Sequence, residues 1–558
     1  MKLKDLEKVH VRIPGLVKDL KSGNMGRRDF LRTTTLLGLS AGTAYAVAGK
    51  VTGEHFVPRA KAQGQYGGVL RIGMSILEIS DPAIADWSEK GNISRQMLEQ
   101  MARIGTDNIT HPWLAESWSA NDDLTVWTFN LRPGVKWSNG DDFIAEDVAA
   151  NFARWLDPAV GSSNISRFAA LTSTTEAGVT VAVDGGVEIV DDLTIRFNLS
   201  RPTLSFPESF GDYPALIAHR SMAEMLAEGR NMMTDPIGTG PFILESMRVG
   251  EEATLRKRPA SEYWGEEVYL DGLRYIDLGP DPQAHYGALA SGQVDLLYTI
   301  DVNLRDQFES TDGIKVYDKT TAVTGVARMR ITEPPFDNIN LRRAIQKSVN
   351  RPIILQLAYQ NNGTVGEDHH VSPIHPEYSP LPELQQDYGE ARALLAEAGY
   401  PDGLELDIQC VSDPKWESDV AQVMREMLAP AGITLNVQIL PGGTYWERWD
   451  QWPFSVTQWT SRPLGVQVLS LGYRTGVPWN ETNYANPEFD ALLDQAEATL
   501  DVEARRDIVR ELQQMMQDDA IIINPLWLEI YTASTDRLEG FAYHISREQH
   551  FNETYLTS

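Results

Sequence analysis

Apolar and polar residues alternate in short runs along most of the chain, and stretches with apolar residues every three or four positions separate these runs. A period of two is typical of strands that bury one face, whereas the wider spacing is typical of amphipathic helices. Strands are predicted at residues 68–73, 124–131, 193–199, 404–410, 433–439 and 520–526, with a turn and a second short strand at 132–137. Helices are predicted at 141–155, 388–398, 420–429, 487–499 and 502–518. Strands that alternate with helices indicate an α/β protein.

Glycine and proline mark where several of these elements end. Gly399 follows the helix predicted at 388–398, at the position where a left-handed residue commonly closes a helix. The run Pro430-Ala431-Gly432 ends the next helix before another strand begins. The sequence contains no repeat of roughly 20–50 residues, which argues against a solenoid.

The N-terminal region has a different pattern. The run Gly26-Arg27-Arg28-Asp29-Phe30-Leu31-Arg32 resembles the twin-arginine export signal of bacteria and archaea. The apolar stretch from Thr33 to Val47 is diluted by threonine and glycine and is shorter than the ~20 apolar residues of a membrane-spanning helix. Because Ala60-Lys61-Ala62 offers a small-x-small cleavage site, residues 1–62 are predicted to be a removable leader. An amphipathic membrane anchor is the alternative, and Met25 is an alternative start.

Composition limits the classes of function and the partners that the protein can have. Residues 1–62 hold 12 Lys and Arg and 5 Asp and Glu, so the remainder holds 37 basic and 73 acidic residues, a net charge of −36. This charge argues against nucleic acid and anionic membrane surfaces as main partners. The remaining ~496 residues exceed the usual size of one core, so two or more lobes are expected.

Cys410 is the only cysteine in the chain. An intramolecular disulfide is therefore excluded, which suits a protein that folds in the cytoplasm before export. A lipid-modified cysteine behind the leader is excluded too. These features predict a soluble periplasmic protein.

The sequence gives little support for a catalytic motif or a cofactor-binding motif. Gly38-Leu39-Ser40-Ala41-Gly42 matches a nucleophile elbow, but it lies inside the leader with no strand before it. Gly238-Thr239-Gly240 lacks a third glycine and precedes Pro241, which suits a tight turn. With no phosphate-binding loop, no HExxH and no cysteine pair, a periplasmic hydrolase is a weak alternative.

His369, His370 and His375 form the one cluster of histidines. Imidazoles at this spacing could hold a transition metal such as nickel. The favoured interpretation is a proline-rich loop in which His369 and His370 form hydrogen bonds or touch a ligand, because adjacent side chains of an extended chain point to opposite sides.

Several stretches together resemble one family, the solute-binding proteins of peptide, nickel and opine ABC transporters (extracellular solute-binding proteins, family 5). The matching stretches are Asn121–Gly140 with Phe143–Val148, Pro236–Phe242, Tyr263–Gly265 with Tyr269–Asp271, Leu341–Ile345 with Val349–Arg351, and Ala391–Pro401. They occur in order over essentially the whole chain behind the leader.

The resemblance implies a two-lobe periplasmic-binding-protein fold of type II, of the large class with an extra subdomain, around a hinged cleft. The first lobe would comprise residues 63–99, 238–325 and 525–558, with residues 100–237 as its inserted subdomain. Residues 326–524 would form the second lobe. The chain would cross between lobes near Val323-Thr324-Gly325 and Asn524-Pro525.

The resemblance also points to a ligand site. In peptide-binding members, a Trp-x-x-Asp stretch in the second lobe holds the ligand's α-ammonium group. The corresponding stretch here is Gln458–Leu464, where Arg462 replaces the carboxylate. A guanidinium offers a planar fork of donors suited to a carboxylate, so the expected ligand carries at least one. The alternative is an arginine that faces solvent or pairs with a neighbouring acid.

Aromatic residues concentrate in the same region, at Tyr445, Trp446, Trp449, Trp452, Trp459, Tyr473 and Trp479. Most are expected in the core. Trp459 is predicted to form a wall that stacks on the ligand, with Tyr445 as a further contact. A tryptophan face also suits a quaternary ammonium or guanidinium group, so a zwitterionic solute is compatible. In the first lobe, Trp87 lies about where the family's chain reaches the cleft; a buried packing residue is the alternative.

Together these observations predict a periplasmic carrier without catalysis and without a cofactor. It would capture a small carboxylate-bearing solute, such as a peptide or an opine, and deliver it to an ABC permease and ATPase complex. Its other expected partner is the twin-arginine translocase, and a monomer is expected. A nickel or metal-chelate carrier and a sensor subunit are the alternatives among binding proteins.

Overall fold

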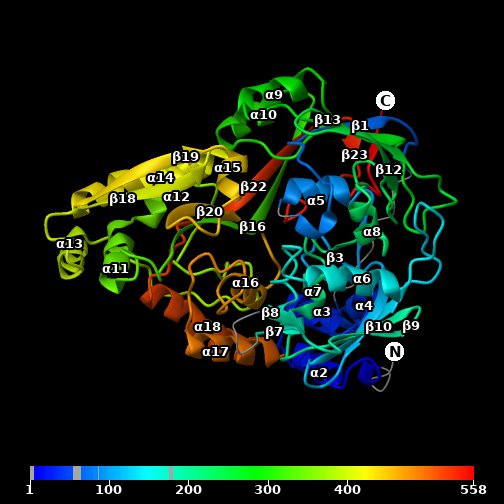
Figure 1. Ribbon diagram of the computed structural model, residues 1–558, viewed down its shortest axis with the longest axis horizontal. Coiled ribbons are helices and arrows are strands. Elements are labelled where there is room, and N and C mark those ends of the chain that lie inside the picture. Colours follow the sequence, from blue (N-terminus) through cyan, green and yellow to red (C-terminus); the bar gives the residue numbers. More distant parts are fainter. Residues whose placement is uncertain (1–5, 54–63, 86, 175–179, 558) are drawn as a thin grey trace. The chain divides into compact units, whose positions relative to one another are not determined.

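The computed structural model describes residues 6–53, 64–85, 87–174 and 180–557 (Figure 1). The chain forms two compact units, which we describe separately. Unit 1 comprises Met1–Ile300, Gln307–Tyr317 and Thr532–Ser558, and unit 2 comprises Asp301–Asp306 and Asp318–Tyr531. Two strands, β16 (Ile314–Met329) and β22 (Leu526–Thr535), each contain a boundary between the units.

Unit 1 is built on a mixed sheet. Its strands lie in the order β12 (Phe242–Arg248), β13 (Glu252–Lys257), β14 (Gly272–Ile276), β1 (Val69–Gly73), β15 (Leu296–Leu297) and the end of β22. Strand β1 runs parallel to both of its neighbours, whereas the outer pairs are antiparallel. The strand predicted at 68–73 is therefore confirmed, and it lies inside the sheet.

A second, antiparallel sheet of unit 1 has the order β5 (Ala115–Ala120), β6 (Val126–Leu131), β10 (Thr194–Asn198), β9 (Val187–Asp191). Helix α6 (Ala145–Trp155) packs on β9 and β10. Trp127, Phe129 and Phe197 are fully buried beneath it, as the alternating pattern predicts. The helix begins later than the predicted residue 141 because Asp142 forms a bridge with Lys136, and this bridge is all that forms of the predicted second short strand.

Shorter elements complete unit 1. The strand pairs are β2 (Glu99–Gln100) with β11 (Leu216–Ile217), β3 (Ala102–Ile104) with β4 (Thr110–Pro112), β7 (Thr172–Thr174) with β8 (Thr180–Ala182), and β23 (Leu538–Glu539) with β24 (Tyr555–Leu556). The helices are α5 (Ser88–Ser94), α7 (Phe206–Ser209), α8 (Met222–Ala227) and α9 (Pro282–Ala290), while α10 (Arg305–Glu309) contains a unit boundary.

The predicted leader is helical where the structure describes it. Helices α2 (Ile13–Ser22), α3 (Arg27–Leu36) and α4 (Ala41–Thr52) belong to unit 1, and Arg27 and Arg28 begin α3. The predicted cleavage site at Ala60–Ala62 lies outside the described residues. Of the helices in the part of the chain that the structure describes, none has the length and apolar character needed to span a bilayer.

Unit 2 contains the strand order β22, β16, β20 (Phe454–Trp459), β18 (Leu404–Val411), β19 (Ile433–Leu440). Strand β18 is parallel to both β19 and β20, while β20 is antiparallel to β16. Two short strands, β17 (Gly363–Val365) and β21 (Ile522–Ile523), pair with β22 and β16. The strands predicted at 404–410 and 433–439 are confirmed.

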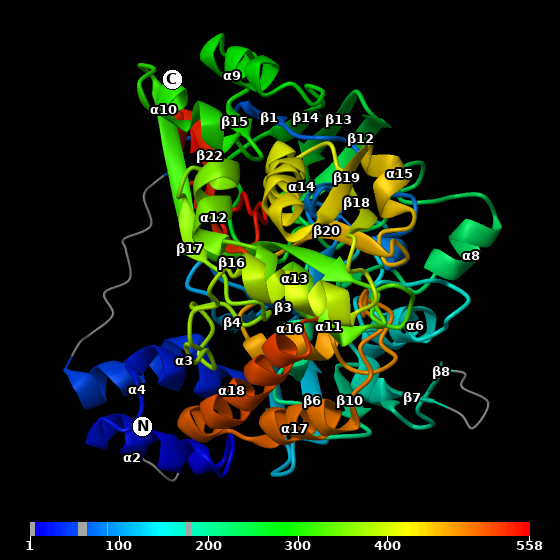
Figure 2. The same cartoon turned by 90° about the vertical axis from the view of Figure 1, so that its left-hand side faces the viewer.

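Unit 2 also contains eight α-helices among the residues that the structure describes, of which α12, α14 and α15 contact strands of this sheet. They are α11 (Ile339–Ser348), α12 (Arg351–Tyr359), α13 (Tyr388–Glu397), α14 (Lys415–Leu428), α15 (Gly442–Trp446), α16 (Gly465–Gly472), α17 (Pro487–Ala498) and α18 (Val502–Asp518). Helix α14 lies against β18 and β19, and α17 and α18 lie side by side (Figures 1 and 2). Gly399 has a φ of 97°, the left-handed conformation predicted after α13.

The unit boundaries differ from the crossings expected near residues 323–325 and 524–525. The structure divides the chain at Tyr317–Asp318 within β16 and at Tyr531–Thr532 within β22. Both strands continue through the boundary without a glycine or proline, so no local sequence signal marks it.

Candidate functional site

The stretch that carries Trp459 and Arg462 leaves the end of a central strand of unit 2. Strand β20 pairs with β16 up to the pair Thr324 and Trp459, and the chain then runs without regular structure to α16. Trp459 therefore has the fixed direction of a strand residue, while Arg462 lies in the connection that follows. Such connections at strand ends commonly carry binding residues because the sheet holds them in place.

Arg462 is buried, with 2% of its surface exposed. Its Nη1 donates to the carbonyl and hydroxyl oxygens of Thr460, each at 3.0 Å. The centre of the guanidinium lies 5.6 Å from the ring of Trp459 and 5.8 Å from that of Trp479. An arginine flanked by two indoles at this distance gains cation–π attraction. The sequence-based alternative of an arginine facing solvent is thus excluded.

A buried ion pair holds the Trp459 indole in place. Its Nε1 donates to Glu481 at 2.6 Å, and Glu481 pairs with Arg328 at 2.8 Å. Burial raises the pKa of Glu481, and the charge of Arg328 opposes that shift. Arg328 also donates to the backbone carbonyls of Trp449 and Trp452. The ion pair therefore connects β16, β20 and the tryptophan-rich segment.

Three indoles meet edge to face beside Arg462. The ring centroids of Trp449 and Trp479 lie 5.6 Å apart, and those of Trp459 and Trp479 lie 5.7 Å apart. Trp449 contacts Trp459 at 6.5 Å. Trp449 and Trp479 are half-buried, whereas Trp459 is 4% exposed. Sequence reasoning does not single out Trp479 from the other aromatic residues, because its aromatic character is the only local signal at that position.

The histidine loop reaches the same place. His370 lies edge to face with Trp459 at 5.2 Å, and its Nδ1 forms a 2.8 Å hydrogen bond with the hydroxyl of Tyr473. Burial lowers the pKa of His370 well below its usual value, and the charges of His375 and Arg462 lower it further. At neutral pH the ring is therefore uncharged. His375 Nε2 lies 3.0 Å from the carbonyl oxygen of Arg462.

The three imidazoles do not share a common centre. His369 bonds to Glu367 at 2.9 Å and to Gln513 at 2.8 Å, whereas the partners of His370 and His375 lie elsewhere. Among the described residues, no group of three or more His, Cys, Asp or Glu side chains is placed to hold a metal ion. The loop instead contacts the segment that carries Arg462, through the hydrogen bond of His375 with the carbonyl oxygen of Arg462.

Tyr445 and Trp87 have other surroundings, which we describe separately. Tyr445 is fully buried in unit 2, where its hydroxyl contacts the carbonyl oxygen of Val456 at 2.6 Å and the hydroxyl of Thr457 at 2.8 Å. Burial raises the pKa of Tyr445. Trp87 belongs to unit 1, is half-buried and occupies the N-cap position of α5.

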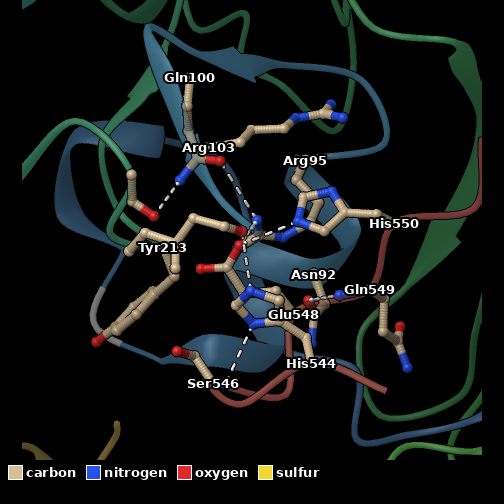
Figure 3. A network of polar contacts seen from close by, with 12 residues as sticks. Asn92, Arg95, Gln100, Arg103, Tyr213, His544, Ser546, Glu548, Gln549 and His550 are labelled. Atoms are coloured by element: carbon tan, nitrogen blue, oxygen red, sulfur yellow. Dashed lines mark hydrogen bonds and ion pairs between the residues drawn. The ribbon is translucent and has the colours of Figure 1, made fainter. Parts of the chain in front are cut away.

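A buried polar network holds α5, and with it Trp87, against the C-terminal segment of unit 1 (Figure 3). Asn92 donates to the carbonyl oxygen of Arg547 at 3.0 Å and accepts from the amide of Gln549 at 3.0 Å. Arg95 pairs with Glu548 at 2.5 Å, and Glu548 also contacts His550 at 3.1 Å. Because these contacts join segments far apart in sequence, no local pattern announces them.

Comparisons with known proteins bear on the family and the fold of this chain. Residues 110–481 match the family described as bacterial extracellular solute-binding proteins, family 5. Heme-binding protein A of Haemophilus influenzae is 28% identical over 469 residues, which are 80% of this chain and 84% of that protein.

Two solved structures share the fold. The periplasmic binding protein DppA of Helicobacter pylori, in complex with the peptide STSA, has a TM-score of 0.77 and 22% identity and covers 88% of this chain and 99% of its own. The binding protein AgaA of A. tumefaciens R10, in complex with agropinic acid, has a TM-score of 0.76 and 21% identity with the same coverage. These likenesses confirm the predicted two-lobe α/β fold.

Proposed function

Since this chain belongs to the bacterial extracellular solute-binding proteins of family 5, we propose that it captures a small carboxylate-bearing organic solute for an ABC importer. The family consists of binding proteins, and the chain is a solute-binding protein. The class of its solute follows from the site in unit 2.

Arg462 carries the proposal. Its guanidinium is buried, lies within 5.8 Å of two adjacent indole rings and donates from Nη1 to Thr460. A charge-assisted, two-pronged hydrogen bond to a carboxylate is the strongest contact that such a group makes. In peptide-binding members of the family a carboxylate takes the corresponding place, so the charge preference here is reversed. This reversal favours an acidic group at the position that would otherwise hold an ammonium.

The tryptophans supply the apolar part of the proposed site. Trp459 forms its rigid wall, because Glu481 fixes the indole. Trp479 lies next to Trp459, with the two ring centroids 5.7 Å apart, and its ring is 5.8 Å from the Arg462 guanidinium. The uncharged ring of His370 packs edge to face against Trp459. Trp87 of unit 1 is a candidate ligand contact from the family resemblance alone, while Tyr445 and His369 act indirectly, through the packing of unit 2.

The relatives show how varied the family's cargo is. One is named for heme, and the two solved structures hold a peptide and agropinic acid. For this chain we propose a peptide, an opine or another small carboxylate, taken up after export through the twin-arginine pathway. The carrier acts as a monomer and passes its solute to an inner-membrane permease and its ATPase.

Native mass spectrometry of the purified protein tests the proposal. Protein prepared from the periplasmic fraction is expected to retain a small molecule, released on denaturation, that contains a carboxylate. The released acid and its methyl ester are then titrated by calorimetry. We expect the ester to bind about 100-fold more weakly, because it loses the ionic hydrogen bonds to Arg462. Equal affinities of acid and ester would contradict the proposal.

A further inference from the structure

The predicted leader packs against the rest of unit 1 through α3. Every residue from Phe30 to Leu36 in α3 is buried, and Phe30 itself has no exposed surface. Helix α3 contacts β4, and the two lie side by side in Figure 2. This helix therefore has a specific partner within its own chain, which we call the docking face (residues 107–112 and 115–120).

Three hydrogen bonds link the leader to the docking face or to its border. Trp118 Nε1 donates to the carbonyl oxygen of Leu36 at 2.9 Å. Arg32 donates to the carbonyl oxygen of Asn108 at 3.3 Å, and the hydroxyl of Tyr45 donates to Asp107 at 3.1 Å. Burial and the neighbouring Asp107 carboxylate raise the pKa of Tyr45 to about 12, which keeps its hydroxyl protonated as the donor.

Gly38 is the point of closest approach. Its φ is 92°, and a Cβ atom at this position would lie 2.0 Å from the carbonyl oxygen of Trp118. Only a residue without a side chain allows the backbone of the leader to reach the backbone of β5. Gly23, by contrast, has a φ of 79°, and a Cβ atom there would meet nothing within 4 Å.

The leader and the rest of the chain also differ in charge. Residues 1–62 carry a net positive charge, whereas the remainder carries −36. This difference attracts the leader at low ionic strength. The contact is nevertheless incomplete, because both polar atoms of the buried Asn108 side-chain amide have no hydrogen-bond partner. A buried amide without partners weakens an interface and so favours release of the leader.

We propose that the leader is a reversible cover of its own protein, docked on this face until export. In the docked state Arg28 is exposed, whereas Phe30 and Leu31 of the same signal are buried. Any receptor that reads the whole signal must first displace it from the docking face. This consequence for export rests on the proposed twin-arginine route, whereas docking itself does not.

Cleavage of the full chain between the leader and the rest of unit 1 tests docking directly. A specific protease site is placed within residues 54–62, the chain is folded intact and cut, and size-exclusion chromatography with mass spectrometry measures whether the N-terminal fragment stays bound. The same measurement is made on Gly38→Ala and on the matched control Gly23→Ala, which introduces the same backbone strain without a contact to the docking face.

The fragment of the unaltered chain and of Gly23→Ala is expected to remain bound at low salt and to dissociate faster at 0.5 M NaCl, a concentration at which charges more than about 4–5 Å apart are screened. Gly38→Ala is expected to release it roughly ten-fold faster or more. Immediate loss of the unaltered fragment, or equal retention in both glycine variants, would overturn the proposal.

A variant on the docking face separates docking from export. Trp118→Phe keeps a ring against Phe129 but removes the donor to Leu36, and it leaves the leader unchanged. We expect faster fragment release in vitro and faster processing in cells. If the unaltered chain is never exported, the twin-arginine proposal fails while the fragment assay still decides docking. Faster release without faster processing in an exported chain would contradict the role of docking in export.

Discussion

Arg462 is the residue on which the proposed ligand class depends. Its guanidinium is buried, donates to Thr460 and lies within 5.8 Å of two indole rings. The proposal is that it binds a ligand carboxylate, which matches the charge and the planar geometry of a guanidinium.

Replacement of this arginine is the residue-scale test. Arg462→Ala is expected to weaken binding of the co-purified solute by about 2–5 kcal/mol, because the ligand's carboxylate would be buried without its partner. Calorimetric titration gives this value directly. Arg425→Ala, at an exposed arginine of α14 paired with Glu426, is the matched control and should leave affinity unchanged. Wild-type affinity in Arg462→Ala would place the arginine outside the site.

Glu481 is a positioning residue with a large expected effect on stability. Glu481→Gln leaves the buried Arg328 without its counter-charge, which typically costs about 3–5 kcal/mol. Urea unfolding should show this loss. Glu333→Gln removes a half-exposed partner of Arg330 instead and should cost about 1 kcal/mol or less. Equal losses in the two variants would show that Glu481 and Arg328 do not form a buried pair in solution.

At the scale of elements, local sequence signals account for most helix boundaries. Side-chain caps begin many of the helices, such as Asp387 before α13, whose carboxylate accepts from the amide of Glu390 at 2.9 Å. Gly399 then closes α13 in the left-handed conformation. These signals act within one turn of helix, which is why they can be recognised without tertiary information.

Gly399→Ala tests the end of α13. We expect a loss of about 1–2 kcal/mol in the free energy of unfolding, because alanine is strained at a φ of 97°. Thermal and urea unfolding provide the measurement. Gly443→Ala in α15 is the control, since its methyl group meets nothing within 4 Å and its φ is not left-handed. An unchanged free energy of unfolding in Gly399→Ala would mean that the end of the helix relaxes without an energetic cost.

The network that anchors α5 predicts sensitivity to acid. Burial lowers the pKa of His550 to about 3, and the charges of Arg103 and Arg95 add to this shift against the opposing effect of Glu548. In the unfolded chain His550 therefore binds a proton near pH 6.5, whereas in the folded chain it stays unprotonated down to about pH 3. Stability is expected to fall as pH decreases from 7, by about 2 kcal/mol at pH 4.5 from this residue.

Glu548 acts in the same direction at lower pH. The charge of Arg95 and the contact with His550 hold the pKa of Glu548 at about 2 against the opposing effect of burial, so its stabilisation declines below pH 4.5 and is lost as the pH falls through about 2. Urea unfolding at pH 7 and pH 4.5 measures the effect of His550, and a further measurement at pH 3 adds that of Glu548. His550→Gln should reduce the pH dependence, and His285→Gln, in α9, should not. An unchanged slope in His550→Gln would contradict the assignment.

For the whole molecule, location depends on the leader. Substitution of both Arg27 and Arg28 by lysine keeps the charge but removes the planar guanidinium groups, so recognition of the export signal should fail. Cell fractionation is expected to show the full-length chain in the cytoplasm and none of the shorter form in the periplasm. Lys2→Arg, outside the signal, is the control. Normal processing of the double variant would exclude the twin-arginine route.

Much of the architecture follows from the sequence, because its signals are local. Alternation predicts β1, β6, β10, β18 and β19, and three- and four-residue spacing predicts α13, α17 and α18. Motifs spread over the chain indicate the family, and a single substitution at Arg462 indicates the class of ligand. These features depend on residues within a few positions of one another or on the identity of one residue.

Long-range contacts required the three-dimensional structure. Trp479 lies beside Arg462, and Glu481 fixes Trp459, although α16 and the loops on either side of it separate them in the chain. Asn92 and Gln549 form a hydrogen bond, although 457 positions separate them in the sequence. The leader finds its docking face through Gly38 and Trp118. Such pairings follow from how elements pack, and packing is decided by the burial of all apolar faces together, which no local pattern encodes.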